Sequence, residues 1–114
     1  MNNYGLVSII TPSYNCGDFI AETIRSVLAQ TYTLWEMIIV DDSSTDATIK
    51  RVEPFLKDPR IRFIRNAGNK GAAYTRNRAL REAKGRWIAF LDADDLWNKE
   101  KLTRKEAYQK ARNK

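Results

Sequence analysis

The chain contains the stretch Trp87-Ile88-Ala89-Phe90, followed directly by Leu91-Asp92-Ala93-Asp94-Asp95. The first four residues are aromatic or aliphatic, and such a run predicts a strand that is buried on both faces. Carboxylates cannot remain inside a core, because an unpaired buried charge is very costly. The three acids must therefore lie at a rim of the fold, where a cation, hydrogen-bond donors or water offset their mutual repulsion.

The three acids offer only oxygen ligands, and the chain contains no histidine. Oxygen ligands suit Mg²⁺ or Mn²⁺ rather than zinc, and Mg²⁺ commonly binds one or two carboxylates together with phosphate oxygens of a substrate. This pattern indicates a metal site that serves a nucleotide. The alternative is a solvated turn or a helix N-cap without any ligand.

The composition fits one cytoplasmic domain. The chain has 114 residues, of which 43% are hydrophobic, so one core is expected. A single cysteine, Cys16, excludes an internal disulfide. No apolar run is long enough to cross a bilayer or to act as a signal peptide, so a reducing setting is predicted. The absence of histidine excludes imidazole catalysis within this chain.

The net charge of +6 is concentrated near the C-terminus. Residues 99–114 contain seven basic and two acidic side chains, whereas residues 1–98 contain thirteen and twelve. A nearly neutral globular part argues against a nucleic-acid partner. We therefore divide the chain into a ligand-binding part, residues 1–98, and a basic helix, residues 99–114. That helix is either solvated or in weak contact with an anionic membrane surface.

Short apolar runs alternate with segments of helical period, which is typical of an α/β domain. Right-handed crossovers then predict a Rossmann-like, mostly parallel sheet with helices on both faces. Ligands of such sheets bind at the carboxyl ends of the strands. The predicted strands are residues 6–10, 35–40, 61–64 and 87–92. The predicted helices are residues 17–30, a helix capped by Ser or Thr in 43–45 and ending near 56, and 72–84, with Gly85 at the C′ position.

Polar residues follow three of the predicted strands, and these rims converge on one crevice. Tyr14 could stack on a nucleobase, and Asp42 could accept a hydrogen bond from a ring N–H. Lys70, Arg76 and Arg78 could contact a diphosphate. Each has a simpler interpretation: Tyr14 as a turn aromatic, Asp42 as a helix-capping acid, and the two arginines as a solvated helix face.

Five segments occur in a fixed order along the chain. They are Val7-Ser8-Ile9-Ile10-Thr11-Pro12-Ser13-Tyr14-Asn15, Ser26-Val27-Leu28-Ala29-Gln30-Thr31-Tyr32, Trp35-Glu36-Met37-Ile38-Ile39-Val40-Asp41-Asp42-Ser43-Ser44-Thr45-Asp46, Asn69-Lys70-Gly71 with Arg76-Asn77, and Leu91-Asp92-Ala93-Asp94-Asp95. Together they closely resemble family 2 of the glycosyltransferases, inverting enzymes of the A-type (GT-A) nucleotide-diphospho-sugar transferase fold. The resemblance extends from residue 6 to about residue 102.

The resemblance implies a nucleotide-sugar donor, most often a uridine diphosphate sugar, and a Mg²⁺ or Mn²⁺ ion. By matching position, Thr11, Pro12 and Tyr14 belong to the nucleoside pocket, and Asp42 binds the base. Arg76 lies near the base or the diphosphate, Asp92 near the ribose and the metal, and Asp94 is the direct metal ligand. Asp41 and Asp95 match less certain, supporting roles.

The implied reaction is displacement at the anomeric carbon by an acceptor hydroxyl of a glycan or lipid-linked acceptor. The metal offsets the charge of the departing diphosphate, and a carboxylate base takes the acceptor proton. In the family this base follows the part that matches here, so we expect it beyond Lys114. The chain is thus predicted to be the donor-binding half of a truncated GT-A domain. It would bind nucleotide and transfer no sugar.

The family implies polysaccharide or envelope glycan synthesis in the cytoplasm or at the inner face of a membrane. The alternative function is a non-catalytic module for nucleotide-sugar binding or assembly. Because a missing half would leave apolar surface uncovered, self-association into a homo-oligomer is a further expectation. A dinucleotide-dependent oxidoreductase is excluded, since Thr11-Pro12-Ser13-Tyr14 replaces the glycine-rich turn that it needs.

Overall fold

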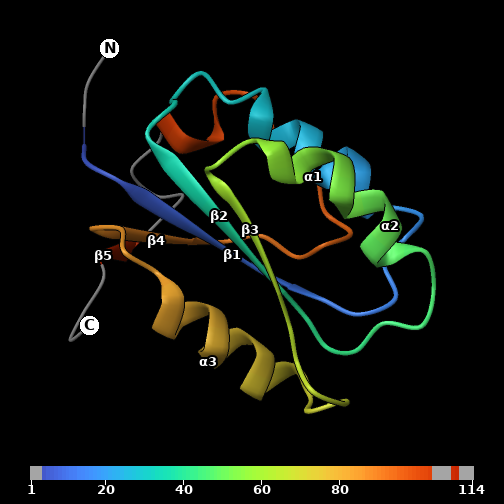
Figure 1. Ribbon diagram of the computed structural model, residues 1–114. Helices are drawn as coiled ribbons and strands as arrows, with labels where there is room; N and C mark the ends of the chain where they lie inside the picture. The colour runs from blue at the N-terminus through green and yellow to red at the C-terminus, as the bar shows by residue number, and fades with distance from the viewer. Residues whose placement is uncertain (1–3, 104–108, 111–114) are drawn as a thin grey trace.

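The computed structural model describes residues 4–103 and the backbone of residues 109–110. A five-stranded sheet of order β3-β2-β1-β4-β5 forms the centre of the molecule (Figure 1). Strands β1 to β4 are parallel, and β5 pairs antiparallel with β4. The strands are β1 Val7–Ser13, β2 Trp35–Asp41, β3 Ile61–Arg65, β4 Trp87–Phe90 and β5 Gln109–Lys110.

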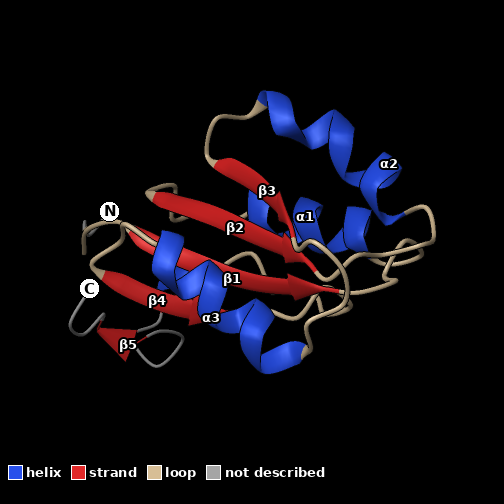
Figure 2. Ribbon diagram, turned by 60° about the horizontal axis from the view of Figure 1, so that its bottom comes forward, coloured by secondary structure: helices blue, strands red, loops and turns tan. Residues whose placement is uncertain are grey.

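Helices cover both faces of the sheet, as predicted (Figures 1 and 2). Helix α3 (Ala72–Glu82) lies on one face, and helices α1 (Ile20–Leu28) and α2 (Thr48–Val52) lie on the other. None of the helices in the described part of the chain is long and apolar enough to span a bilayer.

Two cores follow from the alternation of side chains along the strands. Ile9 of β1 packs with α1 and α2, whereas the next residue, Ile10, packs with Ala79 of α3 and with Ala83, which directly follows that helix. Every residue of β2 is buried, which is expected of a central strand covered on both faces. Buried side chains therefore extend to the ends of β1 and β2, where the polar residues of the candidate site begin.

All three predicted helices end earlier than expected, and α1 ends at Leu28 rather than at residue 30. Helix α2 stops at Val52 and continues as the 3₁₀ helix η1 (Glu53–Lys57), because Pro54 lacks the N–H that an α-helix interior needs. Helix α3 stops at Glu82. The backbone N–H groups of Lys84 and Gly85 instead donate to Glu36 Oε2 (2.6 Å) and Ser8 Oγ (2.7 Å), so Gly85 is not at the C′ position.

The prediction of a basic helix over residues 99–114 is wrong where the structure can be compared with it. Lys101–Thr103 is a short 3₁₀ helix, η2, and Gln109–Lys110 is strand β5. Leu102 is fully buried and its N–H donates to Gln30 Oε1 (3.0 Å), which bends the chain onto α1. Residues 104–108 and 111–114 lie outside the described residues.

Candidate donor and metal site

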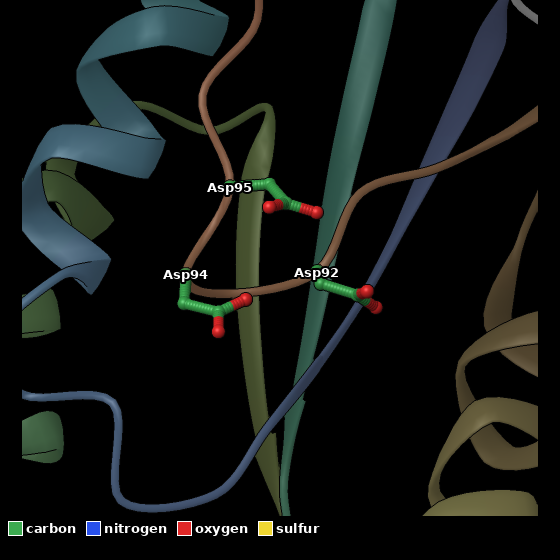
Figure 3. A group of neighbouring side chains, drawn as sticks. All are labelled: Asp92, Asp94 and Asp95. Atoms are coloured by element: carbon green, nitrogen blue, oxygen red, sulfur yellow. The ribbon is translucent and has the colours of Figure 1, made fainter.

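The three acids after β4 lie on one turn, which we call the acidic turn (Asp92–Asp95). All three carboxyl groups are exposed, and one oxygen of each lies within 4.8 Å of the others. Figure 3 shows the side chains of Asp94 and Asp95 directed toward the side of the turn that carries Asp92. The backbone supports this arrangement, because the Asp95 N–H donates to the Asp92 carbonyl at 3.0 Å.

The acidic turn suits a hard divalent cation by its donor set. Three carboxylates close together repel one another, and a cation that accepts oxygen ligands relieves this repulsion. Exposure leaves room for water and phosphate oxygens to complete the coordination, as Mg²⁺ requires. The residues therefore fit a Mg²⁺ or Mn²⁺ site.

Asp42 follows β2 and is almost fully buried, with 5% of its surface exposed. Its Oδ1 accepts hydrogen bonds from Lys70 N–H (2.7 Å) and Asn66 Nδ2 (2.9 Å), and its Oδ2 accepts one from Gly71 N–H (2.9 Å). Burial raises the pKa of Asp42, but these hydrogen bonds outweigh it and lower the pKa below its usual value. Asp42 therefore remains ionised and holds the loop in front of α3.

Asp41 is fully buried and shapes the loop after β2. Its Oδ1 accepts hydrogen bonds from Ser13 Oγ (3.2 Å) and Ser44 Oγ (2.6 Å), and its Oδ2 accepts one from Ser44 N–H (2.8 Å). Arg65 Nε lies 3.8 Å from Asp41 Oδ2. The Asp41 carboxylate therefore holds the loop after β2 in place and does not reach the solvent.

The end of β1 brings three predicted nucleoside residues to the same edge of the sheet. Tyr14 is 51% exposed and Pro12 is half-buried, so both can contact a ligand. Thr11 is fully buried, and its hydroxyl has no hydrogen-bond partner among the described residues. Thr11 therefore lies behind the surface that Pro12 and Tyr14 present.

The predicted basic residues differ in how far they are free to bind a ligand. Arg76, on α3, is exposed, and its side chain makes no hydrogen bond or ion pair with the described residues. Arg78 donates from Nη1 to the Arg65 carbonyl (3.0 Å) and to Asn66 Oδ1 (3.1 Å), so its guanidinium group supports the loop. The side chain of Lys70 is exposed, while its N–H contacts Asp42.

Sequence reasoning missed the residues that tie these loops together. Asn15 Oδ1 accepts hydrogen bonds from Thr45 N–H (2.9 Å) and Asp46 N–H (3.3 Å), and Asn15 has a positive φ of 49°. Asn66 Nδ2 bridges Asp42 and Thr75 Oγ1, both at 2.9 Å. Asn15, two residues after the end of β1, is a weak signal of such a turn, because asparagine tolerates positive φ.

Comparison with known proteins agrees with this geometry. The family model described as "Glycosyl transferase family 2" matches residues 8–112. The chain belongs to glycosyltransferase family 2. This confirms the resemblance drawn from the sequence motifs, and the parallel sheet covered on both faces is that of a GT-A domain.

Several family 2 relatives are much longer than this chain. The UDP-Glc:alpha-D-GlcNAc-diphosphoundecaprenol beta-1,3-glucosyltransferase WfgD of Escherichia coli is 52% identical over 102 residues, which cover 90% of this chain and 40% of WfgD. TuaG of Bacillus subtilis (strain 168), whose name refers to teichuronic acid biosynthesis, is 54% identical over 98 residues, which cover 85% of this chain and 39% of TuaG. The chain thus spans about two fifths of the length of these relatives.

Solved structures of two glycosyltransferases are also similar. Staphylococcus aureus TarS 1-349 in complex with UDP matches with a TM-score of 0.80 and 35% identity, over 85% of this chain and 30% of TarS 1-349. The mannosyltransferase PcManGT from Pyrobaculum calidifontis, in complex with GDP-Man and Mn²⁺, matches with a TM-score of 0.80 and 31% identity. The match covers 86% of this chain and 30% of PcManGT.

Proposed function

We propose that this chain is the donor-binding half of an inverting glycosyltransferase that takes its sugar from a uridine diphosphate donor with the help of Mg²⁺ or Mn²⁺. The observation that carries the proposal is that the parallel strands β1, β2 and β4 end on the same side of the sheet, where Tyr14, Asp42 and the acidic turn follow them. A UDP complex of TarS and a Mn²⁺ complex of PcManGT support both ligands.

In this proposal the acidic turn holds the metal and the diphosphate. Asp94 is the direct metal ligand, and Asp92 contacts the metal and the ribose. A bound Mg²⁺ or Mn²⁺ would supply positive charge that stabilises the departing diphosphate. Arg76 has a free guanidinium group and would add a further positive charge near the diphosphate or the base.

The nucleoside is proposed to lie over the ends of β1 and β2. Tyr14 would stack on the base, Pro12 would form the pocket wall, and Thr11 would support that wall from behind. A carboxylate has about four acceptor sites, and Asp42 uses three of them for the loop. One site on Oδ2 therefore remains for a base N–H, which would let Asp42 bind uracil and fix the loop together.

The remaining parts of the reaction are proposed to lie beyond this chain. The catalytic base and the acceptor-binding residues would follow Lys114. The names of WfgD and TuaG suggest a lipid-linked acceptor and a role in cell-envelope glycan synthesis. The proposed location is the cytoplasm or the inner face of a membrane. We also retain self-association and peripheral membrane contact as proposals, and we expect no nucleic-acid partner.

The test is a calorimetric titration of the chain with UDP, with and without Mn²⁺, and with GDP as the comparison nucleotide. Binding that requires Mn²⁺ and prefers UDP would support the proposal. A preference for GDP would show that the donor carries guanosine rather than uridine. No binding of either nucleotide would contradict the proposed donor-binding site. Sugar transfer by this chain alone would refute the assignment of the base to the part beyond Lys114.

The same titration on a full-length protein distinguishes catalysis from binding alone. A full-length enzyme is expected to bind the donor and to release UDP when it transfers the sugar to an acceptor. Metal-dependent donor binding without any transfer would favour the alternative, a non-catalytic binding or assembly module.

A further inference from the structure

Helix α1 carries a polar stripe within its otherwise apolar face. Thr23, Ser26 and Gln30 are spaced three and four residues apart and therefore share one side of the helix, although Gln30 lies just beyond its end. Thr23 is completely buried, at a position where an apolar side chain would bury more hydrophobic surface. A buried hydroxyl needs hydrogen-bond partners, and the two nearest partners of the Thr23 hydroxyl lie far away in the sequence.

The Thr23 hydroxyl contacts the backbone on both sides of Asp94. Thr23 Oγ1 lies 2.9 Å from the Ala93 carbonyl oxygen and 2.8 Å from the Asp95 carbonyl oxygen. A third carbonyl, that of Phe19 within the same helix region, is more distant at 3.2 Å. One hydroxyl has a single proton to donate, so the two nearer carbonyls share it.

The stripe continues along the segment that follows the acidic turn. Ser26 Oγ accepts a hydrogen bond from Trp97 N–H at 3.2 Å. Gln30 donates from Nε2 to the Asn98 carbonyl (2.7 Å) and accepts from Leu102 N–H (3.0 Å). Helix α1 therefore holds the main chain at intervals from Ala93 to Leu102, and Thr23 provides the contact closest to the carboxylates.

We propose that Thr23 is a positioning residue for the metal site. Three neighbouring carboxylates repel one another and favour an open turn when no cation is bound. The Thr23 hydroxyl opposes this by fixing the carbonyls that flank Asp94, so the turn is preformed before the ion arrives. The inference rests on the proposed function, since it assumes that the acidic turn binds Mg²⁺ or Mn²⁺.

The test compares three variants of the chain. Thr23→Val keeps the shape of the side chain and removes the hydroxyl, whereas Thr23→Ser keeps the hydroxyl. Val52→Ala is the matched control for lost stability, because Val52 is buried in the same core on α2 and α2 makes none of the described hydrogen bonds to residues 91–98. The readouts are amide hydrogen exchange of residues 92–98 without metal, and the Mn²⁺ affinity measured by electron paramagnetic resonance.

We expect Thr23→Val to raise the amide exchange rates of residues 92–98. It should also weaken Mn²⁺ binding about 10-fold, because loss of a group that orients metal ligands typically weakens metal affinity by about 10- to 100-fold. Thr23→Ser should remain within about 2-fold of the wild type on the same scale. Val52→Ala should lower the melting temperature and leave Mn²⁺ affinity unchanged.

Three outcomes would overturn the inference: unchanged exchange in Thr23→Val, equal Mn²⁺ affinities of the valine and serine variants, or an equal loss of affinity in Val52→Ala. A wild-type chain that binds no Mn²⁺ would instead contradict the metal site in the proposed function. The exchange data, collected without metal, would still decide whether Thr23 fixes the turn.

Discussion

Asp42 accepts a hydrogen bond of 2.7 Å from the backbone N–H of Lys70, which joins the end of β2 to the loop in front of α3. The bond is charge-assisted and partly buried. Burial of the Asp42 carboxylate raises its pKa, and this bond lowers it. The outcome is a lowered pKa, so the ionised carboxylate is the form that stabilises the fold.

The first prediction concerns acid stability. Because the folded pKa of Asp42 lies below the unfolded value of about 3.9, its contribution is complete above that pH and is lost as the pH falls through the folded pKa. Asp42→Asn should lower the free energy of unfolding by about 2 kcal/mol at pH 7, since one amide group cannot accept all three hydrogen bonds. The difference between the free energies of unfolding of wild type and variant, measured with urea, should become smaller below about pH 4. An equal difference at pH 7 and pH 3 would show that Asp42 does not act through its charge.

The second prediction concerns the metal. Asp94→Asn should abolish the Mn²⁺ dependence of UDP binding, because an amide oxygen is a weaker ligand for a hard cation than a carboxylate. Asp18→Asn is the matched control, since Asp18 is exposed, lies outside the acidic turn and undergoes the same change of charge. Calorimetry with and without Mn²⁺ measures both. Retained Mn²⁺ dependence in the Asp94 variant would remove Asp94 from the ligand set.

The third prediction compares two glycines. A Cβ at Gly85 would lie 2.5 Å from Ser8 Oγ and 2.8 Å from the Leu6 carbonyl oxygen, so Gly85→Ala should lower the free energy of unfolding by about 3 kcal/mol. Gly68 has a φ of +84° and no atom within 4 Å of such a Cβ, so Gly68→Ala should cost only about 1 kcal/mol of backbone strain. Chemical denaturation measures both values. Equal losses would show that the close approach to β1 is not what requires Gly85.

The fourth prediction concerns Cys16. Burial is the main cause that raises the pKa of its thiol, and the nearby Asp94 charge adds to it. Alkylation of Cys16 by iodoacetamide should therefore be slower than that of a free cysteine at pH 8. The midpoint of the pH dependence of its alkylation rate should lie at a higher pH. Asp94→Asn should move this midpoint downward only slightly, because burial persists. A large shift in that variant would mean that charge, rather than burial, controls the thiol.

Strands β1 to β4 were predictable because each combines a short apolar run with a polar end, whereas β5 was not predicted. The sequence analysis correctly placed the acids of residues 92–95 at a rim and Asp42 at the end of a strand. Strand β1 extends three residues beyond the predicted end, to Ser13, because its polar residues still pair with β2. Such pairing depends on the neighbouring strand and is not visible in local composition.

The contacts that shape the site could not be predicted from local patterns. Asp46, rather than a serine or threonine, accepts the Thr48 N–H at the start of α2, and it also accepts the Gly17 N–H. Thr23 lies on α1, and its two nearer hydrogen-bond partners are 70 and 72 residues away in the sequence. Long-range hydrogen bonds of this kind depend on how the elements pack, which the order of residues does not reveal directly.

The strand order has a consequence for how the domain folds. Strand β1 pairs with β2 over a separation of 28 residues, as in Val7↔Trp35, but with β4 over 80 residues, as in Val7↔Trp87. Closing the longer loop costs more chain entropy and slows that pairing. We therefore expect the β1-β2-β3 half to assemble first and the acidic turn to be built last. Substitutions in β4 should then mainly accelerate unfolding, whereas substitutions in β2 should slow folding itself.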